Sequence, residues 1–288
     1  MANNEPTLNE IVAALRGKID DEFSGWAIDG AVHALMDCEN PLRLNFFSTA
    51  IRILFEHIMD TSSPEDQVIK TCWFKPERTD DRPTRWQRVI FAIQGGLSET
   101  FVGEELKVDV LPLRKRLLDS VNELSKHVHG RENTIIRIQS EQDMVVKRMV
   151  AEMGAFLDAL HECREAVLTP IAEALDGAAV DALMSETIMA VDELATHHSV
   201  DEIYTDSATV HTIGADSVTY RATGEVEVTL QWGSNSDVRQ GDGAEAAQSF
   251  PFQCEFQVPI DDPWNLDFAK VTCGVDTSRW RDAMTTDE

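Results

Sequence analysis

The sequence predicts an α+β fold, in which an N-terminal α-helical bundle is followed by a small antiparallel β-sandwich or open-barrel domain. Two patterns support this prediction. Apolar residues recur at helical spacing up to residue 198, and they alternate with polar residues beyond it. A chain of 288 residues with 43% hydrophobic content is long enough to form two ordinary cores. We therefore expect a helical domain over 1–198 and an acidic β-rich domain over 199–288.

Amphipathic stretches predict the first helices. Apolar residues fall on one helical face over Leu8–Arg16 and again over Leu42–Met59. Helix is expected from Trp86 to Ile93, where the following Gly95-Gly96 pair ends it, and from about Leu113 to Val128.

The remaining parts of the first domain are a connection and a long helical region. Residues 60–85 contain three prolines and many turn formers, so we expect an irregular segment whose apolar island, Thr71–Phe74, docks onto the bundle. Residues 133–198 are rich in Ala, Leu, Met and Glu, which predicts two or three long helices with an interruption near Gly177. These helices are a candidate dimer interface.

Alternation predicts the strands of the second domain. It is clearest over Glu225–Trp232 and Phe250–Val258, present at Val271–Val275, and weaker at Ser207–Val210 and Ser217–Tyr220.

A polar loop is expected to join the two clearest strands, over residues 233–249. Loops of this length in compact domains are usually functional or disordered. Asp237, Asp242 and Glu245 are candidate ligand residues there, although their spacing does not fit an EF-hand and a solvated loop is the alternative.

Charge is distributed unevenly along the chain. Residues 43–148 hold 17 of the 25 Lys and Arg against 16 Asp and Glu, whereas residues 149–288 hold 6 against 27. The middle segment is therefore the part that we expect to contact a polyanion such as nucleic acid.

Apolar runs, cysteines and known cofactor motifs limit the classes of protein to which the chain could belong. The sequence contains no run of about 18 apolar residues and no secretory signal, so we expect a cytoplasmic protein without a membrane partner. The five cysteines are odd in number and widely spaced, which predicts reduced thiols rather than disulfides or a zinc ribbon. No Walker loop, nucleophile elbow or dinucleotide fingerprint occurs, so we expect no cofactor and assign no metal site.

Several stretches together resemble one bacterial family. They are CWFKPE at Cys72–Glu77, RWQRVIFAIQGGL at Arg85–Leu97, KRLLDSVNELSKHVHGRE at Lys115–Glu132, LQWGSNSDVRQGDGAE at Leu230–Glu245 and SFPFQCEF at Ser249–Phe256. The chain resembles the bacterial proteins described as predicted pPIWI-associating nucleases. That resemblance implies a role in prokaryotic conflict systems, which defend against phage and plasmids. The helical part is also similar to HEPN-type domains, which include dimeric, metal-independent ribonucleases with an Arg-x4-6-His motif.

Arg52 and His57 satisfy the spacing of that motif. A cationic arginine beside a histidine could stabilise a phosphate while the histidine transfers a proton. Two observations oppose the match. Ile53 follows the arginine where the motif usually has a polar residue, and residues five apart on a straight helix point about 140° away from each other. Arg52 could equally form an ordinary ion pair with Glu56.

A second basic corner lies around His129 and Arg131, which are also candidate catalytic residues. A helix end here could bring histidine and guanidinium groups around a phosphate. The alternative is a helix C-terminus that Gly130 caps and that basic residues stabilise. The residues expected to bind nucleic acid are Arg85, Arg88, Arg114, Lys115, Arg116 and Lys126.

These observations leave two functions open. The first is a nuclease-like effector of an antiviral system that acts on RNA or DNA, with a metal-independent ribonuclease favoured if the chain is active. The second is a non-catalytic sensor or adaptor whose β-rich domain binds a ligand or a defence-system protein and whose helical bundle forms a homo-oligomer.

Overall fold

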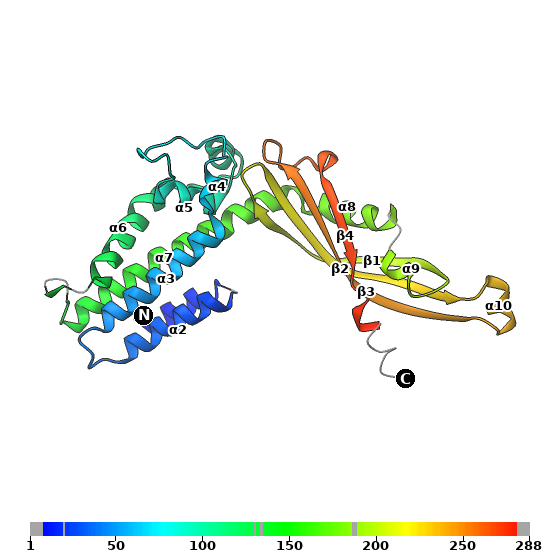
Figure 1. The fold of residues 1–288 in the computed structure, drawn as a ribbon, viewed down its shortest axis with the longest axis horizontal. Coiled ribbons are helices and arrows are strands. Elements are labelled where there is room, and N and C mark those ends of the chain that lie inside the picture. Colours follow the sequence, from blue (N-terminus) through cyan, green and yellow to red (C-terminus); the bar gives the residue numbers. More distant parts are fainter. Residues whose placement is uncertain (1–7, 20, 130, 133–134, 186–188, 281–288) are drawn as a thin grey trace, which may run out of the picture. The chain divides into compact units, whose positions relative to one another are not determined.

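The computed structural model describes residues 8–19, 21–129, 131–132, 135–185 and 189–280. Contacts divide the chain into two compact units, 1–163 and 164–288. We call them the helical unit and the sheet unit (Figure 1). The predicted α+β class is confirmed. The sheet begins at His197, whereas the sheet unit begins at residue 164 and also includes the preceding helix α8 (Ala172–Ser185).

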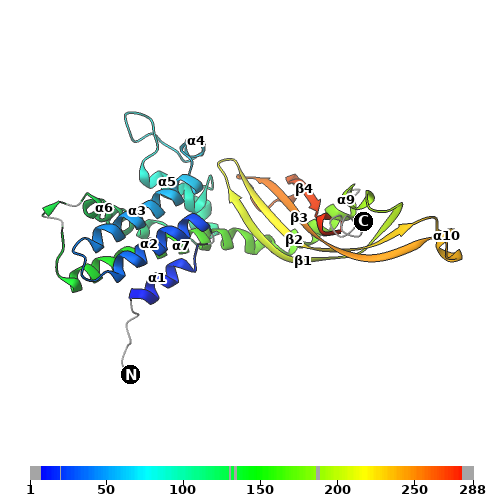
Figure 2. The same ribbon diagram turned by 60° about the horizontal axis from the view of Figure 1, so that its bottom comes forward.

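The helical unit contains a set of helices that surround a central one, α3. The elements are α1 (Leu8–Arg16), α2 (Glu22–Met36), α3 (Arg43–Ser62), α4 (Glu65–Val68), α5 (Arg85–Gln94), a π-helical turn (Phe101–Glu105), α6 (Leu111–Val128) and α7 (Gln139–Leu168). Both Figure 1 and Figure 2 show α2, α3 and α7 running alongside one another. The four helices that the sequence predicted before residue 129 correspond to α1, α3, α5 and α6.

The core of the helical unit lies around α3. Phe47, Ile51 and Leu54 are completely buried because they share one face of that helix. The ring of Phe55 packs against the ring of Phe156 of α7, with 6.0 Å between the centroids.

Arg43, at the first residue of α3, is a buried cation with a full set of partners. Its side chain donates hydrogen bonds to Gln142 and Asp143 of α7 and to the carbonyl of Leu35. Its side chain is only 3% exposed, so these bonds replace the water that the guanidinium would otherwise keep.

Local sequence signals fix both ends of α5. Thr84 and Gln87 form a capping box at the N-terminus, and Gly95 follows the last helical residue with a φ of 58°, which favours glycine. The indole Nε1 of Trp73 donates to the carbonyl of Gly95 at 3.0 Å. The predicted docking of the Thr71–Phe74 island thus occurs at the glycine stop of α5.

Two details differ from the sequence-based expectation. Helix α2 was not predicted, because Phe23 and Trp26 are exposed and blur its apolar face. The interruption between α7 and α8 (Ala172–Ser185) lies at the 3-10 turn Thr169–Ile171 and not near Gly177. Pro170 cannot donate a backbone hydrogen bond, whereas a single exposed glycine costs a helix only about 1 kcal/mol.

The sheet unit contains one open antiparallel sheet in the order β1-β2-β3-β4. Its strands are β1 (His197–Ile213), β2 (Ser217–Trp232), β3 (Ala244–Pro259) and β4 (Lys270–Val275), with the short helices α9 (Met189–Asp192) and α10 (Asn235–Gln240). The weakly predicted strands at Ser207–Val210 and Ser217–Tyr220 are parts of the longer β1 and β2. Alternate residues of β2 and β3 are buried, and α8 packs on the sheet.

A disulfide joins Cys254 of β3 to Cys273 of β4, which are paired directly across the two strands. The prediction of reduced thiols is wrong for this pair, because only the strand register places two cysteines so distant in sequence opposite each other. The other three, Cys38, Cys72 and Cys163, are free thiols.

None of the helices in the described part of the chain combines the length and the apolarity that crossing a membrane requires.

Candidate functional site

His57 is held by a carboxylate from the neighbouring helix. Its Nε2 lies 3.3 Å from Oδ1 of Asp21, and its ring lies against that of Phe23, with 4.5 Å between the centroids. The imidazole remains 30% exposed. A histidine with one nitrogen bound to a carboxylate and an accessible ring has the arrangement of an oriented acid-base group.

Asp21 has two roles in this pair. It caps α2, since Oδ1 accepts a hydrogen bond of 2.8 Å from the backbone N–H of Ser24. Burial raises its pKa, but the hydrogen bonds from Ser24 and the charge of the nearby His57 outweigh this effect, so the pKa of Asp21 is lowered overall. Asp21 therefore stays ionised beside His57. It was missed in the sequence, because its contact with His57 depends on how α2 packs on α3.

Arg52 does not join His57. Its Nε donates to Oε1 of Glu56 at 2.8 Å, one helical turn along α3. The alternative of an ordinary ion pair is thus what the structure contains, and the geometry of the Arg-x4-6-His pair is absent from these described side chains.

The two histidines at the end of α6, His127 and His129, have different surroundings. His127 is buried, and its carbonyl accepts a hydrogen bond from Nδ2 of Asn45 at 2.5 Å. His129, Lys126 and Arg131 are exposed at the helix end. Gly130, the expected cap, lies outside the described residues.

The two candidate catalytic corners lie at different ends of α3. Asn45 binds the end of α6 near the start of α3, whereas His57 comes 12 residues later on the same helix. At 1.5 Å per residue, His57 lies roughly 18 Å along the axis of α3 from Asn45, the residue that binds the end of α6. His57 and His129 therefore cannot act on one phosphate together.

The predicted nucleic-acid-binding residues have diverse surroundings. Arg88 donates to the carbonyls of Met59 and Ser63 and to Asp60, so it caps the C-terminus of α3. Arg116 lies 3.6 Å from Glu152.

Arg85 is exposed at the first residue of α5. It and Lys126 have no ion-pair partner within the described part of the chain. The side chains of Arg114 and Lys115 lie outside the described residues.

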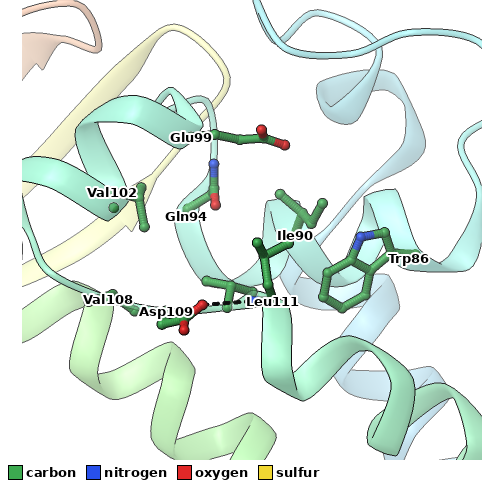
Figure 3. A pocket seen from close by; sticks show the side chains of 10 residues that line it. Trp86, Ile90, Gln94, Glu99, Val102, Val108, Asp109 and Leu111 are labelled. Atoms are coloured by element: carbon green, nitrogen blue, oxygen red, sulfur yellow. Dashed lines mark hydrogen bonds between the residues drawn. The ribbon is translucent and has the colours of Figure 1, made fainter.

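Two adjoining hollows lie along α5. The first has a volume of about 130 Å³ and apolar walls, among them Trp86 and Ile90, and is shown in Figure 3. The second, of about 350 Å³, is lined by Trp73 and Lys75. Both share Trp86, Ile90 and the carboxylate of Glu99. We call the two together the α5 groove. Trp73, Lys75 and Glu99 were not among the predicted site residues, because they come from separate segments on either side of α5.

The predicted loop at residues 233–249 is largely ordered secondary structure. Asp237 is part of the capping box of α10, and the backbone and side-chain hydrogen bonds from Ser234 lower the pKa of Asp237. Its carboxylate thus accepts a hydrogen bond within the turn. Asp242 is exposed in the turn that follows α10.

Glu245 belongs to β3. It lines a polar groove of about 510 Å³ with His197 and Gln231, which occupy the same row of the sheet. Within the described residues, no group of three or more His, Cys, Asp or Glu has a metal-binding arrangement.

Comparison with known proteins identifies the family. Two family models described as predicted pPIWI-associating nuclease match residues 16–153 and 160–281. The boundary between the matches lies close to the division between the helical unit and the sheet unit. Neither the curated proteins nor the solved structures contain a significant match. From residue 16 to residue 281, this chain belongs to the family of predicted pPIWI-associating nucleases.

Proposed function

We propose that the protein is a nuclease-like effector of a prokaryotic conflict system and that its helical unit acts on RNA or DNA in the cytoplasm. The family assignment supports a nuclease-like role. The observation that carries the assignment of a site is the pair formed by His57 and Asp21, which presents a part-exposed imidazole of α3 beside the N-terminus of α2. We expect the protein to act as a homo-oligomer, together with a second defence-system protein.

The pair suits metal-independent cleavage of RNA. With Nε2 of His57 held by Asp21, Nδ1 is the nitrogen that can accept the proton of a ribose 2′-hydroxyl. The 2′-oxygen then attacks phosphorus as the bond to the 5′-oxygen breaks. The leaving oxygen takes up a proton, and a 2′,3′-cyclic phosphate and a 5′-hydroxyl are formed.

The test is cleavage of labelled single-stranded RNA, single-stranded DNA and duplex DNA by the full-length protein, with and without magnesium or manganese. We expect His57→Ala to slow RNA cleavage about 100-fold or more, which is the usual contribution of a general acid-base group. Asp21→Asn should have a smaller effect, since asparagine keeps the helix cap but loses the charge.

Two histidine variants serve as matched comparisons. His33→Ala is the control, because His33 is also on α2 but binds only the backbone carbonyl of Asp29. Cleavage that survives His57→Ala but is lost in His129→Ala would move the site to the end of α6 and refute the assignment of His57.

A second candidate function is a sensor or adaptor without catalysis. The ion pair between Arg52 and Glu56 favours it, because the arginine of the predicted catalytic motif is already occupied. The polar groove of the sheet unit, with Glu245 and His197, would then receive a ligand or protein partner. This model predicts a stable complex with a protein encoded nearby and no cleavage of any of the three substrates.

A further inference from the structure

We propose that the α5 groove binds a guanine base of a nucleotide. This inference rests on the proposed function, because it names the base that the helical unit recognises. Its walls, the unpaired carboxylate of Glu99 and the unpaired cation of Lys75 each correspond to a different part of such a ligand.

The walls of the groove suit a planar base. The indole of Trp73 is fixed by its hydrogen bond to the carbonyl of Gly95, and Trp86 is packed into the protein with only 6% exposed. Ile90 lines both hollows. Apolar and aromatic walls that are already held in place favour stacking and apolar contact with a nucleobase.

Glu99 selects the base by its hydrogen-bonding edge. Its carboxylate is exposed and has no partner among the described residues, and Figure 3 shows it extending over Ile90 toward the side of Trp86. A carboxylate only accepts hydrogen bonds. Guanine is the one common base with two adjacent N–H donors, at N1 and N2, on its pairing edge. Adenine and cytosine place an acceptor beside their amino group, and uracil has a single donor between two carbonyls.

Two other polar side chains of the groove, Gln87 and Asp109, already form hydrogen bonds within the protein. The amide of Gln87 donates to the carbonyl of Lys75 and accepts from the backbone of Thr84, so it is used within the protein. The carboxylate of Asp109 accepts from the backbone N–H of Leu111.

The phosphate would lie near Lys75. This side chain is exposed, lines the second hollow and has no ion-pair partner within the described part of the chain, and Arg85 is exposed close by on α5. Glu77 also lines the second hollow. Its negative charge would repel a doubly charged phosphomonoester more than a singly charged phosphodiester. We therefore expect a guanosine within a strand to bind more tightly than free GMP.

The experiment measures binding of two single-stranded 2′-O-methyl RNA oligonucleotides, one all-adenine and one with a single central guanine, to the full-length protein. Neither can be cleaved through the 2′-oxygen, so fluorescence anisotropy reports binding alone. We expect the guanine-containing strand to bind about tenfold more tightly, which corresponds to one good bidentate contact. Calorimetric titration with GMP and AMP tests whether the source is a free nucleotide.

Three variants assign the roles. Glu99→Gln should abolish the preference for guanine, whereas the control Glu104→Gln, at an exposed residue of the π-helical turn that follows Glu99, should retain it. Lys75→Met should weaken binding of both strands equally, because a phosphate contact carries no base specificity.

Each outcome decides for or against the proposal. A guanine preference for the strand or for GMP that is lost in Glu99→Gln supports it and identifies the source. Equal affinity for guanine and adenine, no binding of any probe, or a preference unchanged in Glu99→Gln refutes it. A guanine preference without any nuclease activity would leave this site in place and remove the proposed catalytic function, while cleavage without base preference would do the reverse.

Discussion

The helical unit and the sheet unit differ in what their charges do. Residues 43–148 are nearly neutral overall, yet at least eight of their 17 cations are engaged in ion pairs within the unit. Residues 149–288 carry 27 acidic against 6 basic residues, and the ion pair between Arg221 and Glu255 lies on the sheet. The number of cations in a segment is therefore larger than the number that a polyanion can reach.

Within the described side chains of residues 43–148, few cations have no partner. They are Lys75, Arg85, Lys107, Lys126 and Arg137. Of these, Lys75 and Arg85 lie at or beside the α5 groove, and Lys126 lies at the end of α6. Three of the five unpaired cations thus lie in two small regions that can receive a phosphate, the α5 groove and the end of α6.

The two units also differ in how they are held together. The helical unit depends on buried polar contacts between helices, above all those of Arg43. The sheet unit depends on one buried face, a disulfide between its last two strands and the buried Tyr220. Three variants test this difference, from the largest expected effect to the smallest.

Replacing Arg43 with alanine should reduce the free energy of unfolding of the helical unit by about 3 kcal/mol, because the buried Gln142 and the carbonyl of Leu35 lose their donor and the part-exposed Asp143 loses its ion pair. Urea denaturation followed by circular dichroism measures this. The matched control is Arg52→Ala, which removes only a part-exposed ion pair with Glu56 and should change stability by less than about 1 kcal/mol. Equal losses in the two variants would contradict the structural role of Arg43.

Opening the disulfide should affect only the sheet unit. Because it closes a loop with a sequence separation of 19 residues, we expect Cys273→Ser to lower the free energy of unfolding by about 3 kcal/mol. In the denatured wild-type protein, alkylation without reductant should label Cys38, Cys72 and Cys163 but not the paired cysteines. Labelling of all five cysteines under that condition would show that the pair is reduced, and Cys72→Ser is the control for loss of a thiol alone.

Tyr220 should make the sheet unit sensitive to high pH. Its hydroxyl is buried and donates to the carbonyl of Pro263 at 2.7 Å, and burial raises the pKa of Tyr220 well above its ordinary value. The neutral form is therefore the one that stabilises the fold. This contribution is complete below about pH 10, where tyrosine in the unfolded chain ionises, and declines as the pH rises above it.

The variant Tyr220→Phe isolates the contribution of the Tyr220 hydroxyl to the loss of stability at high pH. Between about pH 9 and pH 11, the wild type should lose about 1 kcal/mol more stability than Tyr220→Phe. The chain has only two tyrosines, so absorbance at alkaline pH follows Tyr204 alone in the variant. Ionisation of Tyr220 near pH 10 in the native protein would contradict its burial.

Local patterns were sufficient for much of the fold. The apolar spacing of α3 and the alternation of β3 depend only on neighbouring residues, so both were predicted from the sequence. The end of α5 at Gly95 was predicted for the same reason, since a glycine pair stops a helix wherever it packs. Helix α2 was missed because its exposed aromatic residues hide the periodicity that local prediction needs.

The candidate sites were decided by contacts that no local pattern encodes. The sequence by itself determined that the chain has a helical part and an alternating acidic part, and it indicated His57 as a residue to test. Only the tertiary structure placed Asp21 beside His57 and paired Arg52 with Glu56. It also brought Trp73, Lys75 and Glu99 to one groove. The strand register placed Cys254 opposite Cys273. The physical reason is that periodicity reports which face of an element is buried, whereas partners distant in sequence are selected by how those faces pack and by strand register.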